Sequence, residues 1–386
     1  MADLLIFIVM DTLLEAPQGQ FQIKRMPFRK HELLRGWDAA DEYLLKQLST
    51  ENPATSSQIT LLNDSFGALA VALSPYKPVV ISDSYLSQQA TRYNLQANGI
   101  AADQVQLLDS LTTPTTKIDY LLIKVPKTMA LLEHQLYTLK PLLTADSKII
   151  AAGMVKNLPA STWKLLENLI GPTVTSLAVK KARLIFATPD NNLTVQETPY
   201  PRSYLLENSS LRIWNHANVF SQNSLDIGSR FLLQHLPDNP DYHDIIDLGC
   251  GNGIIGLMTA LRLPNSKLYF VDESYMALAS AKLNVASGLK TGQAVEFRMD
   301  DCLSSFAYQS ADCIICNPPF HQQQTVGDHI AWQMFQNAFQ VLRKGGELRI
   351  IGNRHLQYHT SLKKLFGNCH MIASNQKFVI LNSFKR

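Results

Sequence analysis

The second half of the chain alternates between short apolar runs, which are typical of buried strands, and longer apolar stretches of helical length. The runs that predict strands lie at residues 245–248, 268–271 and 313–316, around Phe297, and at 347–352. The stretches that predict helices lie at residues 227–236, 254–263, 274–286 and 331–342. Ser274 suits an N-cap, and Lys344-Gly345-Gly346 is expected to end the last helix. Strands that alternate with helices indicate an α/β fold, with a parallel sheet covered by helices on both faces.

The first half of the chain repeats this plan in a weakened form. Four groups of residues correspond in the same order: Leu62 and Gly67 with Leu248 and Gly253, Ser84-Tyr85 and Asn94 with Ser274-Tyr275 and Asn284, Asp119 with Asp312, and Gly171 and Lys181 with Gly367 and Lys377. Ordered correspondences of this kind indicate a duplicated unit. We therefore predict two tandem domains, residues 21–188 and 204–386, joined by a linker at 189–203 that is rich in proline and asparagine. Residues 1–20 stay unassigned.

A glycine-rich loop follows the first predicted strand of the second domain. The segment Asp247-Leu248-Gly249-Cys250-Gly251-Asn252-Gly253 lies between a strand and a helix, where glycine lets a ligand approach the backbone closely. Its spacing differs from the pattern that sets a pyrophosphate on a helix N-terminus. Asp247 also suits an ammonium group better than a polyanion. Asp272, at the end of the next strand, can accept hydrogen bonds from both hydroxyls of a ribose.

The tetrapeptide Asn317-Pro318-Pro319-Phe320 closes the apolar run at 313–316. Its prolines lack an N–H and fix the backbone, which leaves the Asn317 side-chain oxygen and the Pro318 carbonyl free as acceptors. Two acceptors beside the flat ring of Phe320 suit the exocyclic amine of a planar base, whose face the ring would cover. Asn-Pro is also an ordinary turn former. The tetrapeptide therefore indicates a base-binding site only in combination with the glycine loop upstream.

These two segments together resemble the class I S-adenosylmethionine-dependent methyltransferases, and Asn-Pro-Pro-Phe resembles the motif of members that methylate exocyclic nitrogens. The resemblance implies a division of roles around the cofactor: Gly249, Gly251 and Gly253 would face its methionine part, Asp272 its ribose, Asp301 or Asp300 its adenine amine, and Phe220 would pass near it. Asn317, Pro318 and Phe320 would hold the base. His321, next to the motif, would contact the RNA; a structural role and removal of the proton that leaves N2 are the alternatives.

Over nearly its whole length the chain resembles the ribosomal RNA large subunit methyltransferase G family. The segments that carry the resemblance include residues 37–45, 63–69, 123–128, 216–221, 317–323 and 353–356. That family comprises two-domain duplications that methylate N2 of one guanine in 23S rRNA, whereas a sister family, small subunit methyltransferase C, acts on 16S rRNA. The N-terminal segments match the large-subunit family better. The resemblance implies S-adenosylmethionine as methyl donor and 23S rRNA as partner.

The first domain lacks the features that carry the chemistry. Gly249 and Gly251 correspond to Asn63 and Ser65, and Asn317 corresponds to Lys124. We infer a catalytically silent first copy and predict that Lys124 and Lys127 contact RNA, the alternative for both being ordinary surface charge.

The composition is typical of a globular protein without a membrane span. The chain is 46% hydrophobic and 17% charged, as in soluble globular proteins. No apolar run reaches the roughly 18 residues that cross a bilayer, and residues 1–9 lack the basic start of a secretory signal; a short strand is the alternative there. The net charge is only +3, so contacts with RNA must come from local clusters such as Lys24-Arg25.

The five cysteines show no framework spacing, which favours reduced thiols in the cytoplasm. Cys313 and Cys316 are three residues apart on one strand and should therefore face opposite sides of the sheet. We predict no metal site.

Two other functions stay open on the sequence alone. One is methylation of another planar nitrogen, in a DNA adenine or a protein glutamine; the degenerate first copy argues against the glutamine. The other is a non-catalytic RNA-binding assembly factor, against which the intact glycine loop, Asp272 and Asn317 argue. The modified guanine and the oligomeric state stay open as well.

Overall fold

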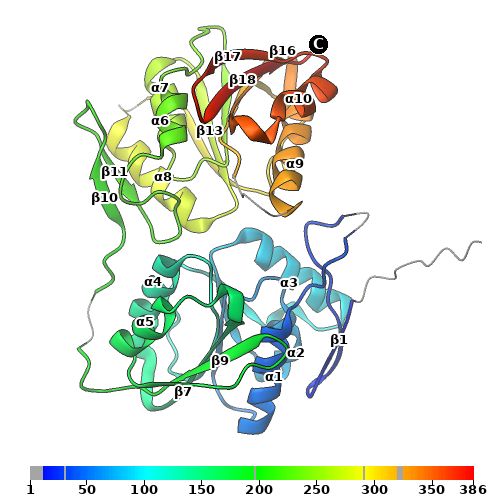
Figure 1. The fold of residues 1–386 in the computed structure, drawn as a ribbon, viewed down its shortest axis with the longest axis vertical. Coiled ribbons are helices and arrows are strands. Elements are labelled where there is room, and N and C mark those ends of the chain that lie inside the picture. Colours follow the sequence, from blue (N-terminus) through cyan, green and yellow to red (C-terminus); the bar gives the residue numbers. More distant parts are fainter. Residues whose placement is uncertain (1–11, 30–31, 195–196, 290–291, 320–324) are drawn as a thin grey trace, which may run out of the picture. The chain divides into compact units, whose positions relative to one another are not determined.

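The computed structural model describes residues 12–29, 32–194, 197–289, 292–319 and 325–386. The chain forms two compact units, the first ending at Pro199 and the second beginning at Tyr200 (Figure 1). This boundary lies inside the segment 189–203 that the sequence suggests as a linker.

The second unit has the alternating order of strands and helices that the sequence predicts. Its elements are β10 (Arg202–Leu205), β11 (Arg212–Asn215), α6 (Ile227–Leu233), β12 (Asp244–Leu248), α7 (Ile254–Arg262), β13 (Lys267–Asp272), α8 (Tyr275–Gly288), β14 (Val295–Met299), β15 (Ala311–Cys316), α9 (Thr325–Val341), β16 (Leu342–Asn353), η5 (Arg354–Leu356), α10 (Tyr358–Phe366), β17 (His370–Ser374) and β18 (Phe378–Phe384). Ser274 is the N-cap of α8, as predicted, and its side chain accepts from the backbone N–H of Ala277.

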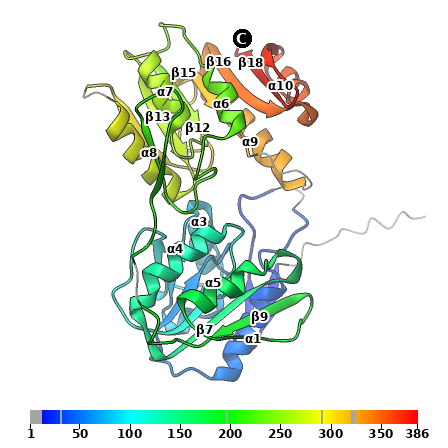
Figure 2. The same ribbon diagram turned by 60° about the vertical axis from the view of Figure 1, so that its left-hand side comes forward.

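The seven-stranded sheet of the second unit has the order β14-β13-β12-β15-β16-β18-β17. Helices cover both of its faces (Figure 2). One core contains Leu232 of α6, Ile255 of α7 and Leu278 of α8. The other contains Phe335 of α9 and Leu362 of α10. Both faces of the central strands are buried, which explains why their sequences are apolar without a break.

The sheet departs from the prediction at one edge. The five strands from β14 to β16 are parallel, but β18 and β17 run antiparallel to their neighbours. The segment Lys344-Gly345-Gly346 does not end a helix in a separate loop. Helix α9 ends at Val341, and these residues form an irregularity inside β16, where the register to β15 shifts.

The first unit repeats the same topology. Its elements are β1 (Leu13–Ala16), β2 (Gly19–Gln22), α1 (Ala39–Glu51), β3 (Ile59–Leu62), α2 (Ala68–Ala72), η1 (Ser74–Tyr76), β4 (Val79–Ser82), α3 (Tyr85–Ala97), η2 (Ala102–Gln104), β5 (Gln106–Asp109), β6 (Ile118–Lys124), α4 (Met129–Leu139), η3 (Lys140–Leu142), β7 (Leu143–Met154), η4 (Val155–Asn157), α5 (Ser161–Leu169), β8 (Thr173–Thr175) and β9 (Ala182–Ala187). The strand order β5-β4-β3-β6-β7-β9-β8 is that of the second unit.

A buried asparagine in each unit shows how closely the copies agree. The side chain of Asn94 accepts from the backbone N–H of Lys24 and donates to the carbonyls of Lys24 and Phe66. Asn284 makes the same three hydrogen bonds, with the backbone N–H and carbonyl of Trp214 and with the carbonyl of Asn252. Each asparagine thus links the loop after the first parallel strand of its unit to the N-terminal segment of that unit. The duplication inferred from spacing is therefore present in the hydrogen bonds.

Equivalent hairpins also begin the two units, β1–β2 in the first and β10–β11 in the second. Residues 12–20, which the sequence left unassigned, thus belong to the repeat, and residues 1–11 lie outside the described part of the chain. Within the described residues, no helix has both the length and the apolar character needed to cross a membrane.

Candidate active site

The predicted site residues of the second unit converge at the carboxyl ends of its parallel strands. Asp247 and the glycine loop follow β12, Asp272 ends β13, Asp301 follows β14, and Asn317 follows β15. β12 and β15 are neighbours at the point where the strand order reverses. In open α/β sheets this switch point is where ligands bind.

The glycine loop forms an open cradle at Gly251. Gly249, Gly251 and Gly253 all have a left-handed backbone, with φ of 70°, 55° and 77°, a conformation that favours glycine. A Cβ added at Gly251 would meet no atom within 4 Å, and one at Gly249 would meet only Cε of Met334, at 3.1 Å. Gly253 differs, because a Cβ there would lie 2.7 Å from Cβ of Ala281. The close packing of the start of α7 on α8 therefore explains why position 253 is a glycine.

Two carboxylates frame the cradle. Asp272 accepts from the backbone N–H of Gly251 through Oδ2 (2.9 Å) and from that of Ser274 through Oδ1 (3.0 Å), and its burial raises its pKa. Asp247 accepts from the N–H of Gly256 (2.8 Å). Burial raises the pKa of Asp247 to about 7, and the nearby charge of Asp272 adds to this effect.

The two aspartates after β14 differ in their environments. Asp300 is buried, and its oxygens accept from Ser304 and Ser305. It therefore stabilises the turn that follows β14. Asp301 accepts from Nε2 of Gln333 (2.8 Å), and burial raises its pKa. Between the two alternatives for the adenine contact, this arrangement favours Asp301.

Asn317 is oriented by a residue that sequence reasoning missed. Its Nδ2 donates to Oγ of Ser229 in α6, at 3.1 Å. Its Oδ1 is buried and has no hydrogen-bond partner within the described part of the chain. Pro318 beside it is buried as well. The Ser229 contact turns the amide so that the oxygen, an acceptor, is left for a ligand. No motif signals Ser229, because it lies 88 residues away in sequence.

Phe220 lies on the segment between β11 and α6 and is 75% exposed. Asn215, at the end of β11, links that segment to the glycine loop: its Oδ1 accepts from Nδ2 of Asn252 at 2.8 Å, and its Nδ2 donates to the carbonyl of Gln222. The predicted contact of Phe220 with the cofactor stays a prediction. Phe320 and His321 lie outside the described residues.

The equivalent loop of the first unit is closed by its own side chains. Asn63 stands where the second unit has Gly249, and it exchanges two hydrogen bonds with Gln135, of 3.0 and 2.9 Å. Gln135 corresponds to Met334, because each lies eight residues before the first residue of the following strand. Beside the position of Gly249, the amide pair therefore occupies the place where the second unit has the side chain of Met334.

A carboxylate has also changed its place in the first unit. The N–H of Ala70, which corresponds to Gly256, is held by Oδ2 of Asp64 at 2.9 Å, and Oδ1 of Asp64 accepts from Gly67 and Ala68. Burial raises the pKa of Asp64 to about 6. The start of α2 is thus capped from within the loop, and Leu61 stands in the place of Asp247.

Lys124 does not have the surface position that its predicted RNA contact requires. Its Nζ lies 2.6 Å from Asp38 and 2.8 Å from Asp41, and its side chain is only 13% exposed. Burial alone would lower the pKa of Lys124, but these carboxylates outweigh burial and raise it. These two carboxylates already compensate the charge of Lys124, which argues against its predicted RNA contact. Lys127 is exposed, and its RNA contact stays a prediction.

Cys313 and Cys316 lie on opposite faces of the sheet, as the sequence predicts. All five cysteines are free thiols. Cys313 packs in the core beneath α6, α7 and α8, whereas Cys316 packs in the core beneath α9 and α10, so the two do face opposite sides. Within the described residues, no group of three or more histidine, cysteine or acidic side chains is placed to hold a metal ion.

The residues around the cradle fit S-adenosylmethionine. A backbone without side chains at Gly251, a carboxylate at a strand end and a second, buried carboxylate match the flat and cationic parts of that molecule. The doubly wound sheet and this site define a class I S-adenosylmethionine-dependent methyltransferase.

The comparisons with known proteins identify the family. Residues 11–191 match the family model for the RLMG N-terminal domain, and residues 210–382 match that for the methyltransferase small domain. A relative from Aeromonas salmonicida, named ribosomal RNA large subunit methyltransferase G, is 46% identical over 98% of this chain and 100% of its own. One of the same name from Erwinia tasmaniensis is 48% identical over 96% and 99%. The chain belongs to the ribosomal RNA large subunit methyltransferase G family.

A solved structure shares the two-unit fold. The T. thermophilus 16S rRNA N2 methyltransferase, determined with AdoMet and guanosine, has a TM-score of 0.74 and 20% sequence identity, covering 97% of this chain and 98% of its own. At this identity the likeness establishes the fold.

Proposed function

We propose that the protein transfers a methyl group from S-adenosylmethionine to N2 of one guanine in 23S rRNA. The family supports the reaction and the RNA. The observation that carries the proposal within the chain is the buried, unpaired oxygen of Asn317, held beside the open cradle at Gly251. An unpaired buried acceptor is costly unless a ligand satisfies it.

S-adenosylmethionine supplies a methyl group made electrophilic by its positively charged sulfur. Asp272 is the residue we assign to the ribose and Asp301 to the adenine amine. Asp247 is assigned to the ammonium group, because its Oδ1 takes part in no hydrogen bond among the described residues. Gly249 and Gly251 would lie against the methionine part, where a side chain would intrude.

Guanine N2 is a poor nucleophile because its lone pair is delocalised into the ring. Acceptors from Asn317 and the Pro318 carbonyl would hold its two N–H bonds and favour a more pyramidal nitrogen. The N2 lone pair then forms the new N–C bond as the C–S bond breaks and its electrons pass to sulfur. One N2 proton leaves to solvent, and the products are N2-methylguanine and S-adenosylhomocysteine. Catalysis is mostly positioning.

The guanine must leave its stack to reach these acceptors. Phe320 would cover its face, and His321 would contact the RNA, both as sequence-based predictions. Since 23S rRNA is the substrate we propose, we place the protein in the cytoplasm.

Transfer of tritiated methyl groups to purified 23S and 16S rRNA, taken from a strain that lacks the protein, tests the proposal. We expect label in N2-methylguanosine of 23S rRNA with the wild type and none with Asn317→Ala. Label on adenine, on 16S rRNA alone or on neither RNA would contradict it.

A further inference from the structure

Asn353 is a second buried amide in the active unit that the reaction described above does not use. It is the last residue of β16 and only 6% exposed. Its Oδ1, like that of Asn317, is buried and has no hydrogen-bond partner among the described residues. An unpaired buried acceptor is costly, so its presence needs an explanation.

Strand register places Asn353 near Asn317. β15 and β16 are parallel neighbours, with Cys316 opposite Ile350. Asn317 therefore falls opposite Ile351, and Asn353 lies two residues further along β16, which corresponds to about 7 Å. Both asparagines stand at the carboxyl edge of the sheet.

The two asparagines also share a face of the sheet. Side chains alternate along a strand, and Ile351 belongs with Leu232 of α6 to one core, so Asn353 is on the α6 side. Asn317 reaches that side as well, because it donates to Ser229 of α6. A Cβ at Gly228 of α6 would lie 3.3 Å from Phe378, the residue paired with Asn353 in β18. Helix α6 thus lies against the neighbours of both amides.

The silent unit has neither amide. Its strand β7 has the same length as β16 and ends at Met154, in the place of Asn353. Asn317 is replaced there by Lys124. The same sheet therefore forms with methionine at this position, and the asparagine is not needed for the fold.

We propose that Asn353 accepts a hydrogen bond from N1–H of the target guanine and so selects guanine over other purines that carry a 2-amino group. This inference rests on the proposed function. The edge of guanine that bears N2 presents the N1–H beside the two N2–H bonds, so three donors lie in a row. Asn317 and Pro318 take the two on N2, and Asn353 takes the third. In 2-aminopurine, N1 has no hydrogen and is an acceptor, which the Asn353 oxygen would repel.

The test uses a synthetic RNA that spans the guanine found by the labelling experiment, made with guanine or with 2-aminopurine at that position. The variant is Asn353→Met, since methionine stands at the equivalent place in the silent unit. We expect kcat/KM on guanine RNA to fall about 10- to 100-fold, the rate on 2-aminopurine RNA to stay within about twofold, and the affinity for S-adenosylmethionine to stay unchanged. Asn353→Asp, which keeps an acceptor, should retain most of the preference for guanine.

The outcomes separate this inference from the proposed function. If the wild type methylates no guanine, the proposed function fails. If the wild type methylates guanine and Asn353→Met keeps the same ratio of guanine to 2-aminopurine rates, the role of Asn353 alone is overturned. Should Asn353→Met not fold, the ratio measured with Asn353→Leu, which also removes the acceptor, decides in the same way.

Discussion

Ser229 of α6 accepts a 3.1 Å hydrogen bond from Nδ2 of Asn317. Since an amide has a donor at one end and an acceptor at the other, this contact selects the atom that faces the pocket. The backbone N–H of Ser229 is itself held by Asp226, the N-cap of α6. The Asn317 amide is therefore oriented from the start of a helix rather than from its own loop.

Removal of this hydroxyl should impair turnover without affecting cofactor binding. In Ser229→Ala the Asn317 amide can flip, and a flipped amide would point its N–H groups at the substrate amine. We expect kcat to fall about tenfold, the loss of roughly one hydrogen bond, with unchanged affinity for S-adenosylmethionine, and recovery in Ser229→Thr. Ser287→Ala, which removes another helical serine hydroxyl of the same unit, is the matched control. A wild-type kcat in Ser229→Ala would show that the contact does not orient Asn317.

The open cradle predicts a specific effect at Gly251. Gly251→Ala would place a methyl group where no atom lies within 4 Å, in the space assigned to the cofactor. We expect the Kd for S-adenosylmethionine, measured by calorimetry, to rise at least tenfold. Gly345→Ala is a close control, because Gly345 also has a positive φ, 84°, and open space around it, so it carries the same backbone cost of about 1–2 kcal/mol. Equal losses of affinity in both variants would assign the effect to strain.

The affinity for S-adenosylmethionine should increase with pH below about 7. Burial raises the pKa of Asp247 to about 7, so its proton must leave before the carboxylate can pair with an ammonium group. We expect the Kd to fall by up to tenfold for each pH unit from 5 to 7 and to level off above. In Asp247→Asn the Kd should be higher and flat over this range; a wild-type slope in that variant would assign the titration to another group.

The raised pKa of Asp247 should also make the stability of the ligand-free protein decrease as the pH rises, whereas the affinity for S-adenosylmethionine increases. A carboxyl with a raised pKa in the folded state stabilises the fold below its unfolded pKa of about 4, and that contribution is lost as the pH rises through about 7. Thermal unfolding without ligand should therefore show a smaller loss of stability from pH 4 to 7 in Asp247→Asn than in the wild type.

Lys124 should prove structural. Lys124→Met leaves the carboxylates of Asp38 and Asp41 without their cation, and breaking a buried pair in this way costs about 3–5 kcal/mol. Chemical denaturation should show this loss, which Lys124→Met combined with Asp41→Leu should partly restore. If Lys124→Met unfolds like the wild type, the ion pair is not a structural element.

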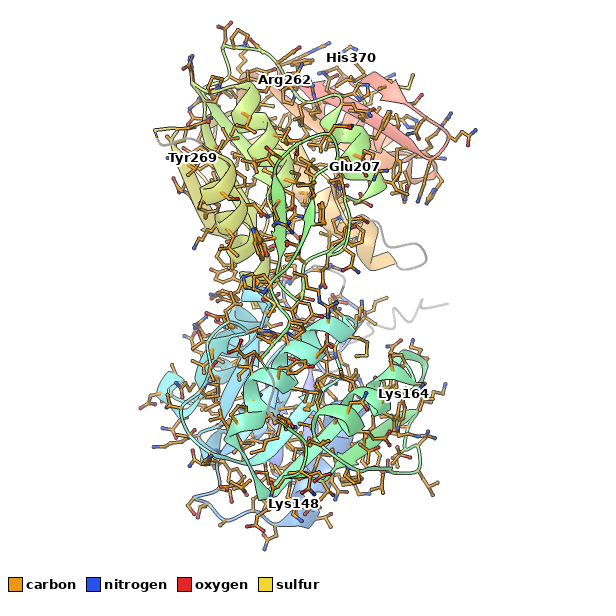
Figure 3. All side chains as sticks on the ribbon, turned by 90° about the vertical axis from the view of Figure 1, so that its left-hand side faces the viewer. Lys148, Lys164, Glu207, Arg262, Tyr269 and His370 are labelled. Carbon is orange, nitrogen blue, oxygen red and sulfur yellow. The ribbon has the colours of Figure 1, made fainter. Side chains whose placement is uncertain are left out.

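Lys127 is the lysine of this segment that should matter for RNA. Because its side chain is exposed, Lys127→Ala should weaken RNA binding and reduce the slope of log K against log salt by about 1. Lys148→Ala and Lys164→Ala, at exposed positions of the same unit (Figure 3), are the controls. An unchanged salt slope in Lys127→Ala would remove it from the RNA contact.

Much of the fold could be predicted from the sequence, because the features concerned are local. Glycines at a strand end, Ser274 as a helix cap and apolar runs of strand length each have a physical cause within a few residues. The duplication was visible because the spacing of Asn94 and Asn284 from their caps is preserved, and the structure shows why: both asparagines hold the same backbone groups.

The parts that could not be predicted depend on contacts between distant residues. Ser229 and Asn353 reach the site through strand order and helix packing, which no local pattern encodes. The ion pair of Lys124 depends on α1, 86 residues earlier in the chain, so its charge looked like a surface charge. The hairpin β1–β2 gives no sequence signal, because its four-residue strands have too few positions for a periodic pattern.

Of the two equivalent folds, the second alone should hold the methyl donor. Equilibrium dialysis of the full chain against labelled S-adenosylmethionine tests it most directly. We predict one molecule bound per chain, lost in Gly251→Val and retained in Gln135→Leu, which alters only the closed loop. Two molecules per chain, none, or binding that survives Gly251→Val would show that the cradle at Gly251 is not the donor site.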